Sequence, residues 1–77
     1  MKREVDVLVL YGKNGSMTPI TIIWDEDHFF EINSIEHVEK TGVWSNGRES
    51  FKYTCTINGK TGHLYYGPDR WYVYPPE

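Results

Sequence analysis

The chain has few of the features on which secreted, membrane-spanning or disulfide-stabilised proteins depend. Its single cysteine, Cys55, allows no internal disulfide and fits a reducing compartment. The start, Met1-Lys2-Arg3-Glu4, carries basic residues. The apolar run behind it is broken by Asp6 and ends by Tyr11, which is too short and too charged for a signal peptide or a membrane span. We therefore expect a cytoplasmic protein with no membrane segment.

Positive charge is also scarce. The chain has eight Lys and Arg residues and eleven Asp and Glu residues, so its formal net charge is −3 at pH 7. The basic residues are scattered along the chain, and no strongly basic surface is available to attract a nucleic acid unaided. This charge balance argues against a protein that binds duplex DNA.

The usual constellations of catalysis and metal binding are absent from the sequence. No two of His28, His37 and His63 have a short chelating spacing. The acidic run Asp25-Glu26-Asp27 lacks the Asp-x-Asp-x-Asp-Gly order of a calcium loop. Cys55 and His63 fall on opposite faces in the registers derived below, so no nucleophile and base can be paired. We predict a protein that is not an enzyme and that uses no cofactor and no metal.

What the sequence does contain is turns between strand-forming runs. Asn-Gly between alternating apolar runs is the strongest short-range hairpin signal, and it occurs three times, at Asn14-Gly15, Asn46-Gly47 and Asn58-Gly59. With 77 residues the chain forms a single domain, 1–77. We predict an all-β fold, a small antiparallel meander of about six strands that curls into an SH3-like barrel or a strongly bent sheet. Closure would remove the exposed strand edges.

The first two connections give a predicted register, because turn length decides which residues lie opposite each other. A two-residue turn at Asn14-Gly15 places six apolar side chains on one face, as the pairs Val9–Ile20, Val7–Ile22 and Val5–Trp24. A three-residue loop after Trp24 then puts Phe30 beside Trp24 and Ile32 beside Ile22. Both predictions place Trp24 in the core.

The stretch 33–44 has two interpretations. Asn33 with Glu36 resembles a capping box, and Gly42 suits a helix end. Against a short helix, Thr41, Val43 and Trp44 favour extended backbone, and the turn at Asn46-Gly47 needs a strand before it. We favour the strand. Its register sets Lys40 opposite Tyr53, a conflict that a bulge at Gly42 or a solvent-exposed sheet end would relieve.

The last three strands have the clearest pattern. Phe51, Tyr53, Cys55 and Ile57 alternate with polar residues, which indicates a half-buried strand. The turn at Asn58-Gly59 sets Tyr53 opposite Leu64 and Phe51 opposite Tyr66. A four-residue turn through Gly67-Pro68-Asp69-Arg70 sets further apolar pairs, Tyr66–Trp71 and Leu64–Val73.

Several segments together resemble a known group of proteins. They are Thr18-Pro19-Ile20-Thr21-Ile22-Ile23-Trp24, Tyr53-Thr54-Cys55-Thr56-Ile57-Asn58-Gly59-Lys60, Leu64-Tyr65-Tyr66 and Trp71-Tyr72-Val73. A Pro-led strand ending in Trp, a Tyr-x-Cys-x-Ile-x-Gly-Lys hairpin and a closing Trp-Tyr-Val are similar to a group of short, uncharacterised all-β bacterial proteins. The resemblance implies a fold and carries no activity or site residue.

The same registers place a set of polar and aromatic side chains on the outer face of the last three strands. Lys52, Tyr65 and Tyr72 form one cross-strand row, and Thr54, His63 and Tyr74 form the next, with Arg70 at the border. Aromatic rings beside cations can stack single-stranded bases, and tyrosine-rich surfaces are typical of protein contacts. Alternatively, other segments cover these rings, or the tyrosines pair only to stabilise the sheet.

From this face we predict a small non-enzymatic binding module. A protein partner or a homodimer is favoured, and single-stranded nucleic acid is the alternative on the same residues. Edge pairing of the first strand is a separate route to a homodimer.

Overall fold

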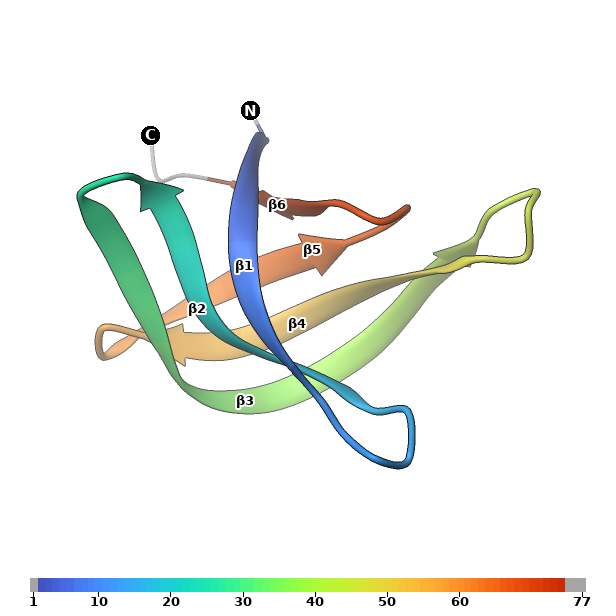
Figure 1. Ribbon diagram of the computed structural model, residues 1–77, viewed down its shortest axis with the longest axis horizontal. Coiled ribbons are helices and arrows are strands. Elements are labelled where there is room, and N and C mark those ends of the chain that lie inside the picture. The colour runs from blue at the N-terminus through green and yellow to red at the C-terminus, as the bar shows by residue number, and fades with distance from the viewer. Residues whose placement is uncertain (1, 75–77) are drawn as a thin grey trace.

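The structure is a computed structural model that describes residues 2–74. It contains six strands, β1 (Arg3–Tyr11), β2 (Met17–Asp25), β3 (His28–Val43), β4 (Glu49–Ile57), β5 (Lys60–Tyr66) and β6 (Trp71–Val73). Each strand pairs antiparallel with the next, and β1 also pairs with β6, which closes a barrel (Figure 1). The predicted six-strand meander curled into a barrel is confirmed. No helix within residues 2–74 is long and apolar enough to cross a membrane.

The stretch 33–44 is extended, as favoured, and nearly all of it belongs to the long strand β3. The register of β3 against β4 shifts three times, between Ile32 and Ser34, between Ile35 and His37, and between Lys40 and Gly42. Bulges bend a strand and increase its twist. They let β3 pair with β2 at its start and with β4 over the rest of its length (Figure 1).

A longer turn than predicted and the last of these bulges together remove the predicted conflict between Lys40 and Tyr53. Val38 lies opposite Tyr53, and Lys40 lies opposite Phe51. The Lys40 ammonium reaches Glu49, with Nζ 3.2 Å from Oε2. The predicted pairing of Lys40 with Tyr53 is therefore wrong. The turn between Trp44 and Arg48 has three residues and shifts the register by one, and the bulge before Gly42 shifts it by one more.

Only one Asn-Gly pair forms a two-residue turn. Asn58 and Gly59 both have positive φ, 52° and 77°, as a type I′ turn requires. At Asn14-Gly15 the Gly12 amide donates to the Ser16 carbonyl at 2.8 Å, and Asn14 Oδ1 accepts from the Ser16 amide at 3.0 Å. That turn therefore has three residues, and Gly15 supplies its left-handed position with a φ of 86°.

The first hairpin also contains a bulge that the sequence did not reveal. Val7 lies opposite Ile22 as predicted, but the register then shifts and Val9 lies opposite Pro19. Pro19 is buried and Ile20 is exposed. The predicted pair Val9–Ile20 is wrong, because the three-residue turn moves the end of β2 by one position.

The join between β2 and β3 also differs from the prediction. Asp25 lies opposite His28, so the loop has two residues, and the register shifts between Ile23 and Asp25. Phe30 consequently lies opposite Ile22, where Ile32 had been expected, and not opposite Trp24. Both predicted pairings at this join are wrong.

The core lies between β1, β2, β4, β5 and β6. Its buried apolar side chains are Val5, Ile22, Tyr53, Cys55, Leu64, Trp71 and Val73. Trp71 lies near two other rings, with centroid distances of 5.6 Å to Tyr53 and 4.7 Å to Tyr66. All predicted pairings among β4, β5 and β6 are confirmed. Correct turn lengths on both sides of β5 explain this agreement.

Candidate functional site: an aromatic groove beside a tyrosine face

The predicted outer row of Lys52, Tyr65 and Tyr72 forms as expected, and so does the pair of Thr54 and His63 in the next row. Lys52 lies opposite Tyr65, Tyr65 lies opposite Tyr72, and Thr54 lies opposite His63. Residues opposite each other in an antiparallel sheet share a face. We call Lys52, His63, Tyr65, Tyr72 and Tyr74 the tyrosine face. Tyr65 and Tyr74 meet edge to face, with centroids 5.0 Å apart and planes at 81°.

The rings of the tyrosine face are partly occupied by contacts within the chain. The Lys2 ammonium lies 4.3 Å from the centre of the Tyr72 ring, and the Lys52 ammonium lies 6.0 Å from that of Tyr65. Both distances fall within the range of cation–π attraction. Tyr65 and Tyr72 are half-buried, whereas Tyr74 is 55% exposed. Tyr74 is therefore the ring of this face that is most accessible to a partner.

Arg70 lies at the border of the face, where its charge is matched. Its Nη1 donates to Glu4 Oε1 at 2.9 Å, and Glu4 lies opposite Tyr72. Both side chains are exposed, so the pair contributes little to stability. Arg70 therefore connects the turn before β6 to β1 and adds little net charge to the face.

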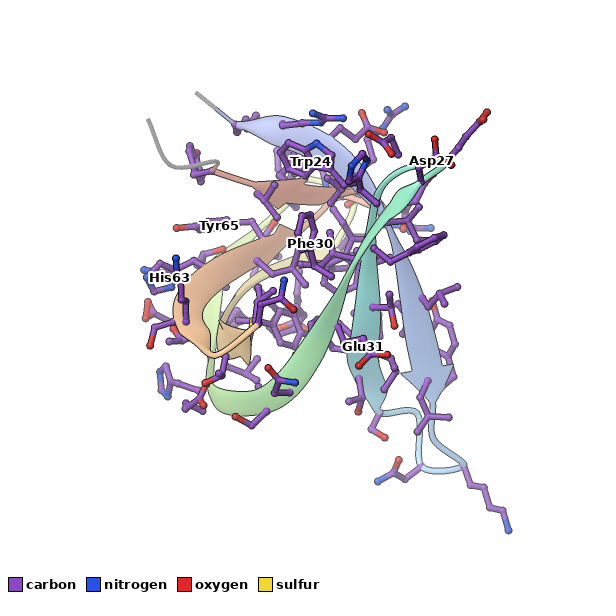
Figure 2. The ribbon with its side chains drawn as sticks, turned by 90° about the vertical axis from the view of Figure 1, so that its left-hand side faces the viewer. Trp24, Asp27, Phe30, Glu31, His63 and Tyr65 are labelled. Carbon is purple, nitrogen blue, oxygen red and sulfur yellow. The ribbon has the colours of Figure 1, made fainter. Side chains whose placement is uncertain are left out.

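Next to the tyrosine face lies an open groove of about 880 Å³ between the β2–β3 hairpin and β5. Figure 2 looks toward it, with Trp24 and Phe30 on one side and Tyr65 and His63 on the other. We call this cleft the aromatic groove. Its aliphatic lining is Ile22, Ile57 and Val73, its rings are Trp24, Phe30, Tyr65 and Tyr74, and Asn58, Lys60 and His63 contribute polar groups.

Trp24 belongs to the wall of this groove. The Arg3 guanidinium stacks on the indole at 3.7 Å from carbon to ring centre, and Arg3 Nη2 donates to the Trp24 carbonyl at 3.0 Å. The edge of Phe30 meets the indole at 6.1 Å and 80°. The register shift at Trp24 explains its place, because bulges redirect side chains. The prediction of Trp24 as a core residue is corrected to a half-buried wall residue.

A glycine helps to leave space for the groove. Gly62 lies opposite the fully buried Cys55, so it occupies an inward-facing position of β5. A Cβ atom at this position would come within 3.2 Å of Ile57 Cδ1. Glycine within a strand often marks such a place. Gly62 is the residue in the sequence that could have indicated a groove beside β5, and no such role was predicted for it.

The titratable side chains of the groove other than tyrosine are Lys60 and His63, and no carboxylate among residues 2–74 lines it. In the acidic turn of the β2–β3 hairpin, the Asp25 carboxylate is hydrogen-bonded within the turn. Its Oδ1 lies 2.7 Å from His28 Nδ1 and accepts a hydrogen bond from the Asp27 amide. These two hydrogen bonds hold the pKa of Asp25 below its usual value. The groove therefore favours an apolar group with a negative charge near Lys60.

Cys55 lies in the core, away from His63. Burial raises the pKa of its thiol, and the charge of Glu36 raises this pKa further. His63 lies outward, with Nδ1 3.3 Å from Thr54 Oγ1. In the part of the chain that the structure describes, no three His, Cys, Asp or Glu side chains gather closely enough to hold a metal ion.

Comparisons with protein family models, with curated proteins and with solved structures found no match to this chain.

Proposed function

We propose that the chain is a small binding module that takes an apolar side chain of a protein partner into the aromatic groove. Four rings from β2, β3, β5 and the residue after β6 surround an open, largely apolar cleft, and this observation carries the proposal. Tryptophan and tyrosine are enriched where proteins bind each other, and a buried anchor in a pocket supplies much of the affinity. The exposed ring of Tyr74 extends the contact to the tyrosine face.

The groove also suggests the chemistry of the partner. Its walls suit an aromatic or branched aliphatic side chain, and Lys60 favours an acidic residue next to that anchor. Arg3 and Lys52 add positive charge beside Trp24 and Tyr65. The whole chain has a net charge of −3, so long-range attraction of an acidic partner is weak. We therefore propose contact specificity for an acidic and aromatic segment, with little electrostatic steering.

Single-stranded nucleic acid is the second candidate. Lys2 beside Tyr72 and Lys52 beside Tyr65 place cations next to rings, as in surfaces that stack bases at about 1–3 kcal/mol per base. The net charge of −3 and the Glu4 carboxylate in the same row oppose a phosphate backbone. Affinity that falls steeply with added salt would support this candidate over a protein partner.

A selection from a random peptide library on the immobilised chain tests the proposal. Selected peptides should contain an aromatic or branched residue beside Asp or Glu, and Tyr74→Ala should weaken their binding at least about tenfold, equivalent to about 1.4 kcal/mol. Phe29→Ala is the matched control, because Phe29 is also an exposed aromatic residue but lies outside the groove. Equal losses in the two variants would refute the groove as the binding surface.

We also propose that the module works in the bacterial cytoplasm and that its barrel is SH3-like. The lone buried Cys55 and the absence of a disulfide partner support the compartment. Six antiparallel strands in meander order support the barrel type.

A further inference from the structure

A second surface lies at the other end of β2, on the hairpin that β1 and β2 form. This hairpin extends beyond the rest of the barrel in both views (Figures 1 and 2). On one side, Asp6–Tyr11 pairs with β2, whereas β6 pairs only with Arg3, Glu4 and Val5. Within residues 2–74 no strand pairs with the other edge of Asp6–Tyr11. That edge therefore presents backbone amides and carbonyls available to another strand.

The unpaired segment is apolar on both faces. Val7 and Val9 pack against the core, while Leu8 and Leu10 point outward and are 54% and 61% exposed. Natural edge strands are usually protected by a charge, a proline or a covering segment. The run from Val7 to Gly12 contains no charged residue and no proline. An apolar edge of this kind is stabilised when another strand covers it.

We propose that β1 of a second copy of this chain pairs antiparallel with this edge, about a two-fold axis at Val9. The sequence around Val9 is symmetric, Leu8-Val9-Leu10. The axis places Leu8 opposite Leu10 of the second copy, and the same contact forms again on the other side. Such an isologous contact requires a self-complementary surface, which this segment provides.

The charges around the segment support the same arrangement. The nearest charged residues on either side are Asp6 and Lys13, which have opposite signs. Antiparallel pairing brings the Asp6 end of one copy to the Lys13 end of the other, so no like charges meet. A second copy is favoured over a different protein because the segment has no charge pattern of its own with which to select one.

The dimer leaves the proposed binding function intact. Met17 and Trp24 lie near opposite ends of β2, so the pairing edge and the aromatic groove are separate surfaces. A dimer would present two grooves at once. Failure of either proposal therefore leaves the other standing.

Sedimentation velocity from about 10 µM to about 1 mM tests the dimer. We expect the mass of the chain, 9.1 kDa, to double as the concentration rises. Leu8→Lys with Leu10→Lys should keep the mass at that of one chain, because the axis places the two ammonium groups opposite each other. Leu8→Lys with Leu10→Glu should restore the doubling, because each new pair then joins opposite charges. Val43→Lys is the matched control, since Val43 is 63% exposed on the β3–β4 hairpin and should not affect the mass.

Two outcomes overturn the proposal. One is a parent chain that keeps the mass of one chain throughout this range. The other is a dimer that persists in the variant with two lysines, because the contact must then use another surface. Circular dichroism of each variant shows that the barrel is folded, so loss of the dimer cannot be attributed to unfolding.

Discussion

At the scale of single residues, the environment of Cys55 is decisive for its reactivity. Its side chain is fully buried, and burial followed by the Glu36 charge raises the pKa of the thiol. Thiolate is the reactive form. At pH 7.5 we expect a disulfide reagent such as dithionitrobenzoate to modify the folded chain roughly a hundredfold more slowly than the chain in denaturant. Equal rates in the two states would show that Cys55 is not in the core.

Glu36 gives the fold a pH dependence on the acid side. Its carboxylate accepts hydrogen bonds from Ser34 Oγ and Thr56 Oγ1, both at 2.6 Å, and these lower the pKa of Glu36. A lowered folded-state pKa means that this stabilisation is present above the unfolded pKa, near 4.5, and is lost as the pH falls through the folded value.

The Glu36→Gln variant should therefore be less stable than the parent above about pH 6. As the pH falls from about 5 to about 3, the variant should lose less stability than the parent does. Urea unfolding at several pH values measures this change. Glu39→Gln serves as the control, because Glu39 is also an exposed residue of β3 but accepts no side-chain hydrogen bond from residues 2–74. Parallel pH profiles for the parent and Glu36→Gln would contradict the assignment.

At the scale of elements, the turn between β5 and β6 depends on a glycine. Gly67 has a φ of +133°, which L side chains rarely adopt, and a Cβ there would lie 3.1 Å from Ser50 Cα. Gly67→Ala should cost about 1–3 kcal/mol. Gly42→Ala should be neutral or stabilising by up to about 1 kcal/mol, because Gly42 has an ordinary φ and open space around it. Urea unfolding of both variants measures the difference, and equal costs would refute the turn geometry.

The pairing of strands was predictable from the sequence wherever the length of the turn was predicted correctly. Two-residue and four-residue turns on either side of β5 were identified correctly, so every pairing among β4, β5 and β6 followed. The predicted register of the first hairpin was wrong because its turn has three residues and not two. In this turn Asn14 Oδ1 accepts a hydrogen bond from the Ser16 amide. The bulges at Ile20 and Trp24 have no local signal in the sequence.

The candidate site was predictable only in part for the same reason. The tyrosine face follows from the β4–β6 registers, so Lys52, Tyr65 and Tyr72 were placed correctly. The aromatic groove also needs Trp24 and Phe30, which reach it through the irregular join of β2 and β3. Sequence patterns that assume regular strands cannot place those two rings.

At the scale of the whole molecule, two tryptophans should differ in their roles. Trp71 is buried against Tyr53 and Tyr66, so Trp71→Ala should cost about 3–5 kcal/mol, a large part of the stability of a small domain. Trp24 is half-buried in the groove wall, so Trp24→Ala should cost less and leave the chain folded. Thermal unfolding followed by circular dichroism measures both. Unfolding by Trp24→Ala but not by Trp71→Ala would reverse the assignment of core and groove.

The central claim is that the aromatic groove binds an acidic and aromatic segment of a protein. An NMR titration of labelled chain tests it most directly, with the capped peptide Asp-Trp-Leu-Asp, its Lys-Trp-Leu-Lys counterpart and an oligothymidylate, at about 50 mM and about 200 mM salt. We predict shifts on the Trp24 indole, Lys60, His63 and Tyr74 with the acidic peptide at both salt concentrations, and weaker shifts with the basic one. Shifts with the oligothymidylate alone, lost at the higher salt, or no shifts at the groove with any probe, would contradict the account.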